Sequence, residues 1–345
     1  MAAVTMKDIA KRAGVSYTTV SNVLTERWRT DARIKVRPDT VEKVLKCARG
    51  MGWVPNNLAR NLVARRSRIF GALIGDLDYG FATELVRAAQ WRLEESHYHL
   101  LPAFTRFEPE RIVKAVDDLV SFQVSGVLCL LFVGVEAVEK ELARRKLPRV
   151  WVDHYDARAL HCVGSDDASG MGALVAHLVD ARGYRRLAYV EPLLGREGES
   201  FRTRTQGLRW RTVEHEAGAR GLAPDLFRFT PALAELEAAP IARWIRASRA
   251  PSALICFNDD VAASLALALH RLGLAYPGDY ALTGYSDGPE IRYLAPSVTT
   301  VRQDVVAMGR QAAELLVDLV EGRGPLRKEI LTPVDLVVRE SVGKA

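Results

Sequence analysis

A short stretch near the amino terminus carries polar side chains of the types and spacing that recognise nucleic-acid bases. They are Tyr17, Thr18, Ser21 and Asn22. On a helix these positions share one outward face, because Val20 and Leu24 take the inward positions. Each side chain ends in a hydrogen-bonding group, and none carries a carboxylate that phosphates would repel. Such a face suits the base edges in the major groove of DNA.

Two short helices joined by a sharp turn would present this face. Thr5 is placed to cap the first helix, with Asp8 in the capping-box position three residues later. Gly14 supplies the left-handed conformation that ends that helix, and Ser16 is placed to cap the second. The same pattern also fits an ordinary solvated helical hairpin, so the bare motif does not decide between the two structures.

Charge is concentrated in the first fifth of the chain. The 345 residues carry a formal net charge of +6. Residues 1–68 contain 15 Lys or Arg against 5 Asp or Glu, a balance of +10, so the remaining residues carry −4. This division is typical of a small nucleic-acid-binding head on a mildly acidic body. An anionic membrane surface is the alternative partner, but no long amphipathic basic helix or lipidation motif supports it.

The length suggests two or three domains, and the pattern after residue 69 predicts an α/β fold. Short runs rich in Val, Ile and Leu alternate with helical segments, which is typical of doubly wound parallel sheets. The apolar runs are residues 69–77, 126–133, 149–155, 185–192, 253–259 and 280–287. They group into two layers that divide near Gly164.

Several observations favour a cytoplasmic protein. The opening residues break their apolar character with charges at once, unlike a signal peptide, and no 18-residue apolar run exists for a membrane span. The cysteines are scattered, without metal-ligand spacing, and we expect them to be reduced core residues. They are Cys47, Cys129, Cys162 and Cys256. We therefore expect neither a metal nor a cofactor.

The turn Ala13-Gly14-Val15-Ser16, followed by Thr19-Val20-Ser21, resembles the helix-turn-helix of the LacI/GalR family of bacterial transcription regulators. The resemblance extends over essentially the whole chain. Its other motifs are Ser165-Asp166-Asp167 with Gly170, Arg204 to Gly207, Asn258-Asp259 and residues 299–304. It implies a sequence-specific repressor that binds double-stranded operator DNA as a homodimer and responds to a small-molecule effector.

The resemblance also implies a division of the chain. Residues 1–52 form the DNA-binding head and residues 53–67 a hinge helix or linker. The body resembles a type I periplasmic-binding protein with two lobes. The amino-terminal lobe comprises residues 68–164, completed by about 300–327, and the carboxy-terminal lobe residues 165–299, completed by about 328–345. Residues 25–37 lack helical periodicity and are predicted to form a loop, longer than in most of the family.

The expected DNA contacts come from the head and the hinge. In the head they are Thr5, Ser16, Tyr17, Thr18, Thr19, Ser21 and Asn22; in the hinge they are Asn57, Ala59, Arg60 and Leu62. In the family a hinge leucine wedges into the minor groove, and Leu62 occupies that position. Alternatively, Leu58 and Leu62 merely pack on the preceding helix.

The expected effector contacts follow the carboxyl ends of the parallel strands, where α/β folds bind ligands. They are Asp78, Phe81, Asp153, Arg204, Asn258, Ser286 and Asp287. The resemblance implies a sugar or a sugar derivative, although Ser286 replaces the aspartate of most members. Strand-end carboxylates also cap helices and Phe81 can simply pack, so structural roles stay open for these residues.

Two other functions compete with this interpretation. Residues 284–288 match the G-x-S-x-G nucleophile motif around Ser286. All 7 histidines precede Ser286, whereas a hydrolase of that fold needs a later one, so we expect no enzyme activity. A solute-binding or chemosensory protein with the same lobes would not need the basic head.

Overall fold

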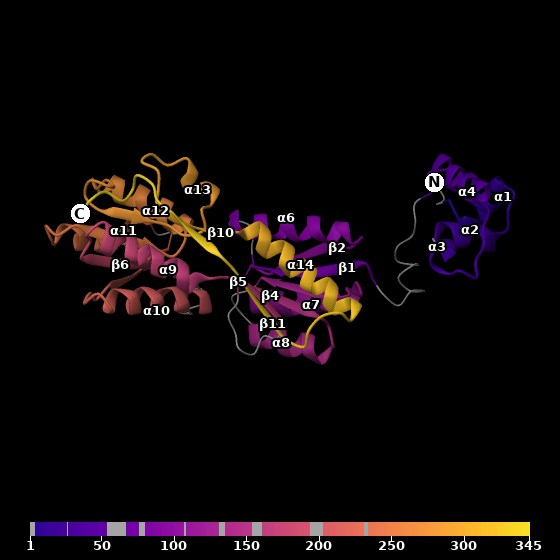
Figure 1. The fold of residues 1–345 in the computed structure, drawn as a ribbon, viewed down its shortest axis with the longest axis horizontal. Helices are drawn as coiled ribbons and strands as arrows, with labels where there is room; N and C mark the ends of the chain where they lie inside the picture. The colour runs from indigo at the N-terminus through magenta and orange to yellow at the C-terminus, as the bar shows by residue number, and fades with distance from the viewer. Residues whose placement is uncertain are drawn as a thin grey trace. The chain divides into compact units, whose positions relative to one another are not determined.

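The computed structural model describes residues 4–25, 27–53, 67–75, 80–106, 108–130, 135–153, 161–193, 203–230 and 234–345. The chain divides into two compact units, Met1–Ser67 and Arg68–Ala345, and most of their elements are labelled in Figure 1. Most of the predicted hinge lies outside the described residues, with Asn57, Ala59, Arg60 and Leu62. No helix among the described residues is long and apolar enough to cross a membrane.

The head is built from short helices around a small core. They are α1 (Met6–Ala13), α2 (Tyr17–Leu24), α3 (Arg27–Thr30) and α4 (Pro38–Gly50). Ile9, Val20 and Val44 are fully buried where α1, α2 and α4 meet. Leu45 of α4 is 37% exposed and does not belong to this core. The core covers only a narrow stripe of α4, and Leu45 lies beside it.

The capping residues of the head are confirmed. Thr5 and Asp8 form the reciprocal capping box of α1, with the Thr5 backbone N–H donating to Asp8 Oδ2 at 2.9 Å. Gly14 ends α1 with a φ of 62°, in the left-handed region. Ser16 Oγ accepts from the Thr19 backbone N–H at 3.1 Å and so caps α2. Such caps each contribute about 0.5–2 kcal/mol to helix stability, so the turn geometry is fixed locally.

The prediction of a loop over residues 25–37 is wrong in one place. Arg27–Thr30 forms the helical turn α3. Trp28 packs against the head core, and this tertiary contact orders a segment whose sequence has no helical periodicity.

The first lobe contains a six-stranded parallel sheet in the order β11-β5-β4-β3-β1-β2. Its strands are β1 (Ile69–Ile74), β2 (His99–Phe104), β3 (Val127–Leu130), β4 (Arg149–Val152), β5 (His161–Ser165) and β11 (Lys328–Thr332). Its helices are α6 (Gly80–Glu95), α7 (Pro109–Ser121), α8 (Val135–Arg144) and α14 (Val305–Glu321). Helix α14 packs closely on α6, because Gly309 has no Cβ; a Cβ there would lie 2.5 Å from the Leu85 carbonyl oxygen.

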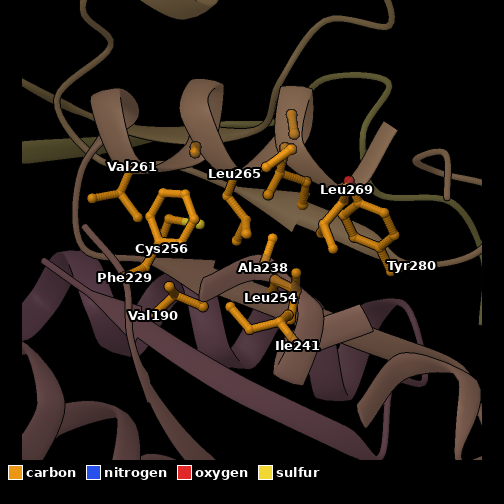
Figure 2. Packing of buried hydrophobic residues seen from close by; sticks show 14 of the residues in the cluster. Val190, Phe229, Ala238, Ile241, Leu254, Cys256, Val261, Leu265, Leu269 and Tyr280 are labelled. Atoms are coloured by element: carbon orange, nitrogen blue, oxygen red, sulfur yellow. The ribbon is translucent and has the colours of Figure 1, made fainter. Parts of the chain in front are cut away.

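The second lobe contains a four-stranded parallel sheet in the order β7-β6-β8-β9. Its strands are β6 (Arg186–Glu191), β7 (Asp225–Arg228), β8 (Ser252–Cys256) and β9 (Ala281–Thr283). Its helices are α9 (Asp167–Ala176), continued by the π-helical turn η1 (His177–Ala181), α10 (Arg204–Gly218), α11 (Ala234–Arg246), α12 (Asp259–Arg271) and α13 (Pro289–Arg292). Figure 2 shows Val261, Leu265 and Leu269 of α12 in one cluster with strand and α11 side chains.

Three segments pass between the lobes. Strand β5 leads directly into α9, β10 (Thr300–Gln303) leads into α14, and β11 leads into β12 (Val334–Val337), which pairs antiparallel with β10. The expected lobe boundary at residue 328 therefore needs correction, because β11 pairs with β5 in the first sheet. The crossing lies after β11, where Thr332 is the last residue paired with β5. These crossings bring the ends of β5 and β10 close together.

Candidate functional site

The outward face of α2 is accessible in the way the sequence predicts. Tyr17 is 52% exposed and Thr18 is exposed, while Ser21 and Asn22 are half-buried one turn later. The hydroxyl groups of Ser16 and Thr19 lie 2.9 Å apart at the start of the helix. Thr5 and Ser16 are exposed, but their side chains already cap α1 and α2. Base contacts by Tyr17, Thr18, Ser21 and Asn22 stay a prediction, as do the DNA contacts of Thr5, Ser16 and Thr19.

Basic side chains surround this face. Lys7, Lys11 and Arg12 of α1 are exposed, and the Lys43 ammonium of α4 lies near the turn at Gly14. Cations placed around a polar helix face bind DNA phosphates and hold the helix in the groove. The head thus places positive charges around a polar helix face, as the predicted binding to DNA requires.

A buried polar network joins the segments that cross between the lobes. At its centre lies Asp167, whose carboxylate accepts from Arg209 Nε at 3.0 Å and from the Tyr285 hydroxyl at 2.7 Å. Ser165 Oγ also donates to Asp167 Oδ1, at 2.7 Å. Arg209 lies over the Tyr285 ring, 3.7 Å from its centroid. The side chains of Arg209 and Asp167 are 3% and 0% exposed, so this ion pair is shielded from water.

The network continues to the end of β10. Gln303 Nε2 donates to Ser165 Oγ at 2.6 Å, and Ser286 Oγ donates to Gln303 Oε1 at 2.8 Å. Ser286, predicted as an effector contact, is therefore also part of the lobe crossing. Its hydroxyl donates to the side-chain amide oxygen of Gln303 and not to a catalytic base.

Asp153 follows β4 beside this network and is 7% exposed. Its φ of 54° lies in the left-handed region that Asp adopts more readily than most residues. The Thr205 hydroxyl of α10 donates to the Asp153 carbonyl oxygen at 3.0 Å, which ties the second lobe to the first. Asp153 Oδ1 has no hydrogen-bond partner among the described residues. Burial, reinforced by the Asp167 charge, raises the pKa of Asp153 to about 7, although Arg209 opposes the shift.

The remaining predicted effector residues are distributed around these crossings. Arg204 is exposed in the first turn of α10, one residue before Thr205. Asn258 caps α12, with its Oδ1 accepting from the Val261 N–H at 3.0 Å. Phe81 packs on the core of the first lobe. Asp78 lies outside the described residues.

Asp287 has a structural role in this arrangement. Arg302 Nε donates to its Oδ2 at 2.8 Å, and an Arg339 guanidinium nitrogen donates to its Oδ1 at 2.6 Å. These ion pairs hold the pKa of Asp287 below its ordinary value despite burial. Asp287 thus links segments that cross between the lobes. Asn258 caps a helix and Phe81 packs in the core, and their effector contacts stay predictions.

The Asp167–Arg209 pair was missed by the analysis of the sequence. A signal existed: Arg209 falls four residues after Thr205 and four before Val213, on the buried side of α10. A charge in such a stripe requires a buried partner. The partner, however, lies 42 residues earlier in the chain, so spacing could not identify it.

Comparisons with known proteins agree with this architecture. A model of bacterial regulatory proteins of the lacI family matches residues 5–56, and a periplasmic binding protein-like domain matches residues 175–342. The chain is 26% identical over 343 residues to the HTH-type transcriptional repressor PurR of Haemophilus influenzae, covering 98% of both proteins. It is 26% identical over 341 residues to the HTH-type transcriptional regulator GntR of Pseudomonas aeruginosa, covering 98% of this chain and 95% of that protein.

Solved structures share the fold. The Lac repressor dimer bound to operator and the anti-inducer ONPF superposes with a TM-score of 0.84 at 23% identity, over 99% of this chain and 100% of that one. The complex of the transcriptional regulator CelR with cellobiose gives 0.68 at 22% identity, over 98% and 99%. The relatives named above are transcription regulators rather than enzymes, in agreement with the engaged Ser286 hydroxyl. The chain is therefore similar to DNA-binding transcription regulators of the lacI family over its whole length, with a head that matches the family's model and a periplasmic-binding-protein-like body.

Proposed function

We propose that this regulator is a cytoplasmic repressor whose operator affinity changes when a sugar or sugar derivative binds at the crossings between the two lobes. The observation that carries the proposal is Asp153 Oδ1, a buried acceptor without a partner among the described residues. Leaving such a group unsatisfied costs about 1–3 kcal/mol, and more when it is charged. A ligand hydroxyl that donates to this oxygen would remove that cost.

Arg204 supplies the complementary group. The bond from Thr205 to the Asp153 carbonyl oxygen holds the start of α10 at the end of β4. Arg204 precedes Thr205 by one residue, about 3.8 Å along the chain, so its guanidinium is within reach of a ligand bound at Asp153. A guanidinium donates two parallel hydrogen bonds, which suits neighbouring hydroxyls or a carboxylate. The Asp153 carboxylate accepts hydrogen bonds and the Arg204 guanidinium donates them, so the two groups together favour a ligand with several hydroxyl groups.

The relatives support this class of ligand. They include a ribose operon repressor of Haemophilus influenzae, 26% identical over 343 residues and 98% of both proteins, and the CelR structure contains cellobiose. We propose that the ligand changes the relation of the two lobes through the segments that cross between them. In a homodimer this change would alter how the two heads reach their half-sites, with the predicted hinge, residues 53–67, as the coupling segment. Coupling free energies of this kind are about 1–3 kcal/mol.

The proposal is tested in three steps. Selection from a random duplex library should first yield a roughly palindromic site with half-sites spaced for two heads. Sedimentation should then give a dimer at micromolar concentration. A panel of pentoses, hexoses, disaccharides and aldonic acids is then titrated against the complex, with operator affinity and melting temperature as readouts.

Two variants locate the ligand. Arg204→Ala should remove the response to the active compound while leaving operator affinity without ligand nearly unchanged. Arg211→Ala is the matched control, because Arg211 is also exposed on α10. Equal losses in the two variants, or a panel without any active compound, would contradict the proposed site.

A further inference from the structure

Four side chains form a continuous row of hydrogen bonds from Ser286 to the buried ion pair of Asp167. Ser286 Oγ lies 2.8 Å from Gln303 Oε1, and Gln303 Nε2 lies 2.6 Å from Ser165 Oγ. Ser165 Oγ in turn lies 2.7 Å from Asp167 Oδ1. Gln303, Ser165 and Asp167 are at most 5% exposed, whereas Ser286 is half-buried. This Ser286–Asp167 row therefore begins at a residue that a solute can reach and ends in the core.

The carboxylate at the inner end fixes the direction of every bond in the row. A carboxylate paired with a guanidinium only accepts hydrogen bonds, so the Ser165 hydroxyl must donate to Asp167. The single hydrogen of Ser165 Oγ is then used, and this oxygen accepts from the amide nitrogen of Gln303. The amide oxygen of Gln303 consequently faces Ser286. Because an amide oxygen also only accepts, the Ser286 hydroxyl donates to it.

Further contacts hold both ends of the row in place. At the inner end, the Tyr285 hydroxyl donates to Asp167 Oδ1 at 2.7 Å and Arg209 Nε donates to Oδ2 at 3.0 Å. At the outer end, the Ser286 N–H donates to the Val301 carbonyl oxygen at 2.8 Å. Ser286 has a φ of 119°, which is rare for serine and persists only where the surroundings impose it. The orientation of the row is therefore a property of the fold.

This orientation limits what Ser286 can offer to a ligand. A serine hydroxyl ordinarily donates or accepts, because it has one hydrogen and two lone pairs. At Ser286 the hydrogen is already used, so only acceptor positions remain. Asp153 Oδ1 is a second acceptor nearby, because the Asp153 N–H donates at 2.9 Å to the carbonyl oxygen of Val163, two residues before Ser165. Both positions therefore call for a hydrogen-bond donor on the ligand.

We propose that Ser286 determines effector specificity by accepting a hydrogen bond from the effector without donating one. The inference rests on the proposed function and defines the chemistry of one position within that site. The effector group that meets Ser286 must be a hydroxyl or an amine. A carboxylate, phosphate or carbonyl oxygen is rejected there, because it would compete with Gln303 for the hydroxyl hydrogen. A donor strengthens the row, since successive hydrogen bonds polarise one another.

Fluorinated sugars test this polarity. Fluorine is close in size to a hydroxyl group but has no hydrogen to donate. The probes are the monofluorinated derivatives of the panel compound that changes operator affinity, with one hydroxyl replaced at a time. Calorimetry gives the affinity of the full-length chain for each derivative. Fluorine at the position that meets Ser286 should weaken binding to the wild type about 3- to 10-fold, which corresponds to one hydrogen bond.

Two variants identify that position. In Ser286→Ala the loss caused by fluorine should disappear at one position and stay at the others. Gln303→Met frees the Ser286 hydroxyl hydrogen and should reduce the same loss while Ser286 is unchanged. Ser169→Ala is the matched control, because Ser169 is exposed and its hydroxyl donates to Asp166 at the start of α9. It should keep every loss. Each loss is a ratio of two affinities for one protein, so partial misfolding does not change it.

The outcomes distinguish the parts of the proposal. A loss that Ser286→Ala abolishes and Gln303→Met reduces supports it. Identical losses in the wild type and Ser286→Ala overturn the contact with Ser286, and identical losses in the wild type and Gln303→Met overturn the row as its cause. A fluorinated derivative that binds the wild type more tightly than Ser286→Ala would show a donating serine and overturn the polarity. A panel without any active compound would overturn the proposed function itself, which is a different failure.

Discussion

Replacing Asp167 by Asn should destabilise the body strongly, although the two side chains have the same shape. Asp167 Oδ1 accepts from Ser165, Tyr285 and an Arg209 terminal nitrogen, and Oδ2 accepts from Arg209 Nε. An asparagine has a single acceptor oxygen, so its amide would direct hydrogens at one of these donors. It would also leave the Arg209 charge buried without a counterion. Breaking a buried ion pair in this way costs about 3–5 kcal/mol.

The converse variant, Arg209→Met, should cost a similar amount. It leaves the Asp167 charge buried with two hydroxyl donors, and it removes the bond from Arg209 to the Phe257 carbonyl oxygen at 2.8 Å. Removing both charges should be less harmful than the sum, because neither charge is then left alone. We expect the double variant Asp167→Asn/Arg209→Met to recover about 0.5–3 kcal/mol relative to additivity.

Urea denaturation followed by circular dichroism would measure all four members of this cycle. Arg211→Met is the control for a loss of positive charge from the exposed side of α10. The reasoning is refuted if both single variants have free energies of unfolding within about 1 kcal/mol of the wild-type value. It is also refuted if the free-energy change of the double variant is the sum of the two single changes.

Three further predictions concern the head, the proposed ligand site and the first lobe. Thr18→Ala and Asn22→Ala should each change the ranking of operator variants by about 1–3 kcal/mol per lost contact, and an unchanged ranking in binding titrations would refute base reading by α2. Burial raises the pKa of Asp153 to about 7. The protonated Asp153 side chain therefore makes its full contribution to stability below about pH 4, and this contribution is lost as the pH rises to 7. Asp153→Asn should make the body more stable than the wild type at pH 8 but not at pH 4, as measured by urea denaturation. Gly309→Ala should lower the melting temperature, because its Cβ would press on the Leu85 carbonyl oxygen at 2.5 Å; an unchanged value would mean that α6 and α14 separate easily.

Features that depend on neighbouring residues could be predicted from the sequence. The capping box of Thr5, the left-handed Gly14 and the Ser16 cap were all predicted, because each involves contacts within a few residues. Strands buried on both faces were found in the same way, since apolar runs such as 126–133 mark them directly. Local chemistry and complete burial leave a clear pattern in a sequence.

Exposed strands at sheet edges were missed. Strands β2 and β7 lie at the edges of their sheets, and their side chains are largely exposed or half-buried. An edge strand needs neither a continuous apolar run nor strict alternation, so neither signal appears. The turn α3 was missed for another reason, because it depends on the contact of Trp28 with the core.

The candidate site also has features that the sequence predicts and features that it does not. The sequence shows which polar residues follow buried strands, but it does not show which partners those residues have. Asp287, for example, was assigned to a ligand, whereas it pairs with Arg302 and with Arg339, 52 residues further along the chain. Arg204 and Asp153 stay predicted ligand contacts, and their test is the titration described above.

The position of β11 and α14 has a consequence for the order in which the protein forms during translation. Both belong to the first lobe, yet both lie near the end of the chain. When residues 68–165 have left the ribosome, five strands of the first lobe are present. Strand β5 still lacks its neighbour β11, and α6 still lacks the helix α14 that packs on it. The second lobe, by contrast, has its four parallel strands by residue 283. The first lobe therefore still lacks a strand and a helix when the second parallel sheet is present, and a nascent chain stalled before residue 305 would expose the apolar surface that α14 later covers.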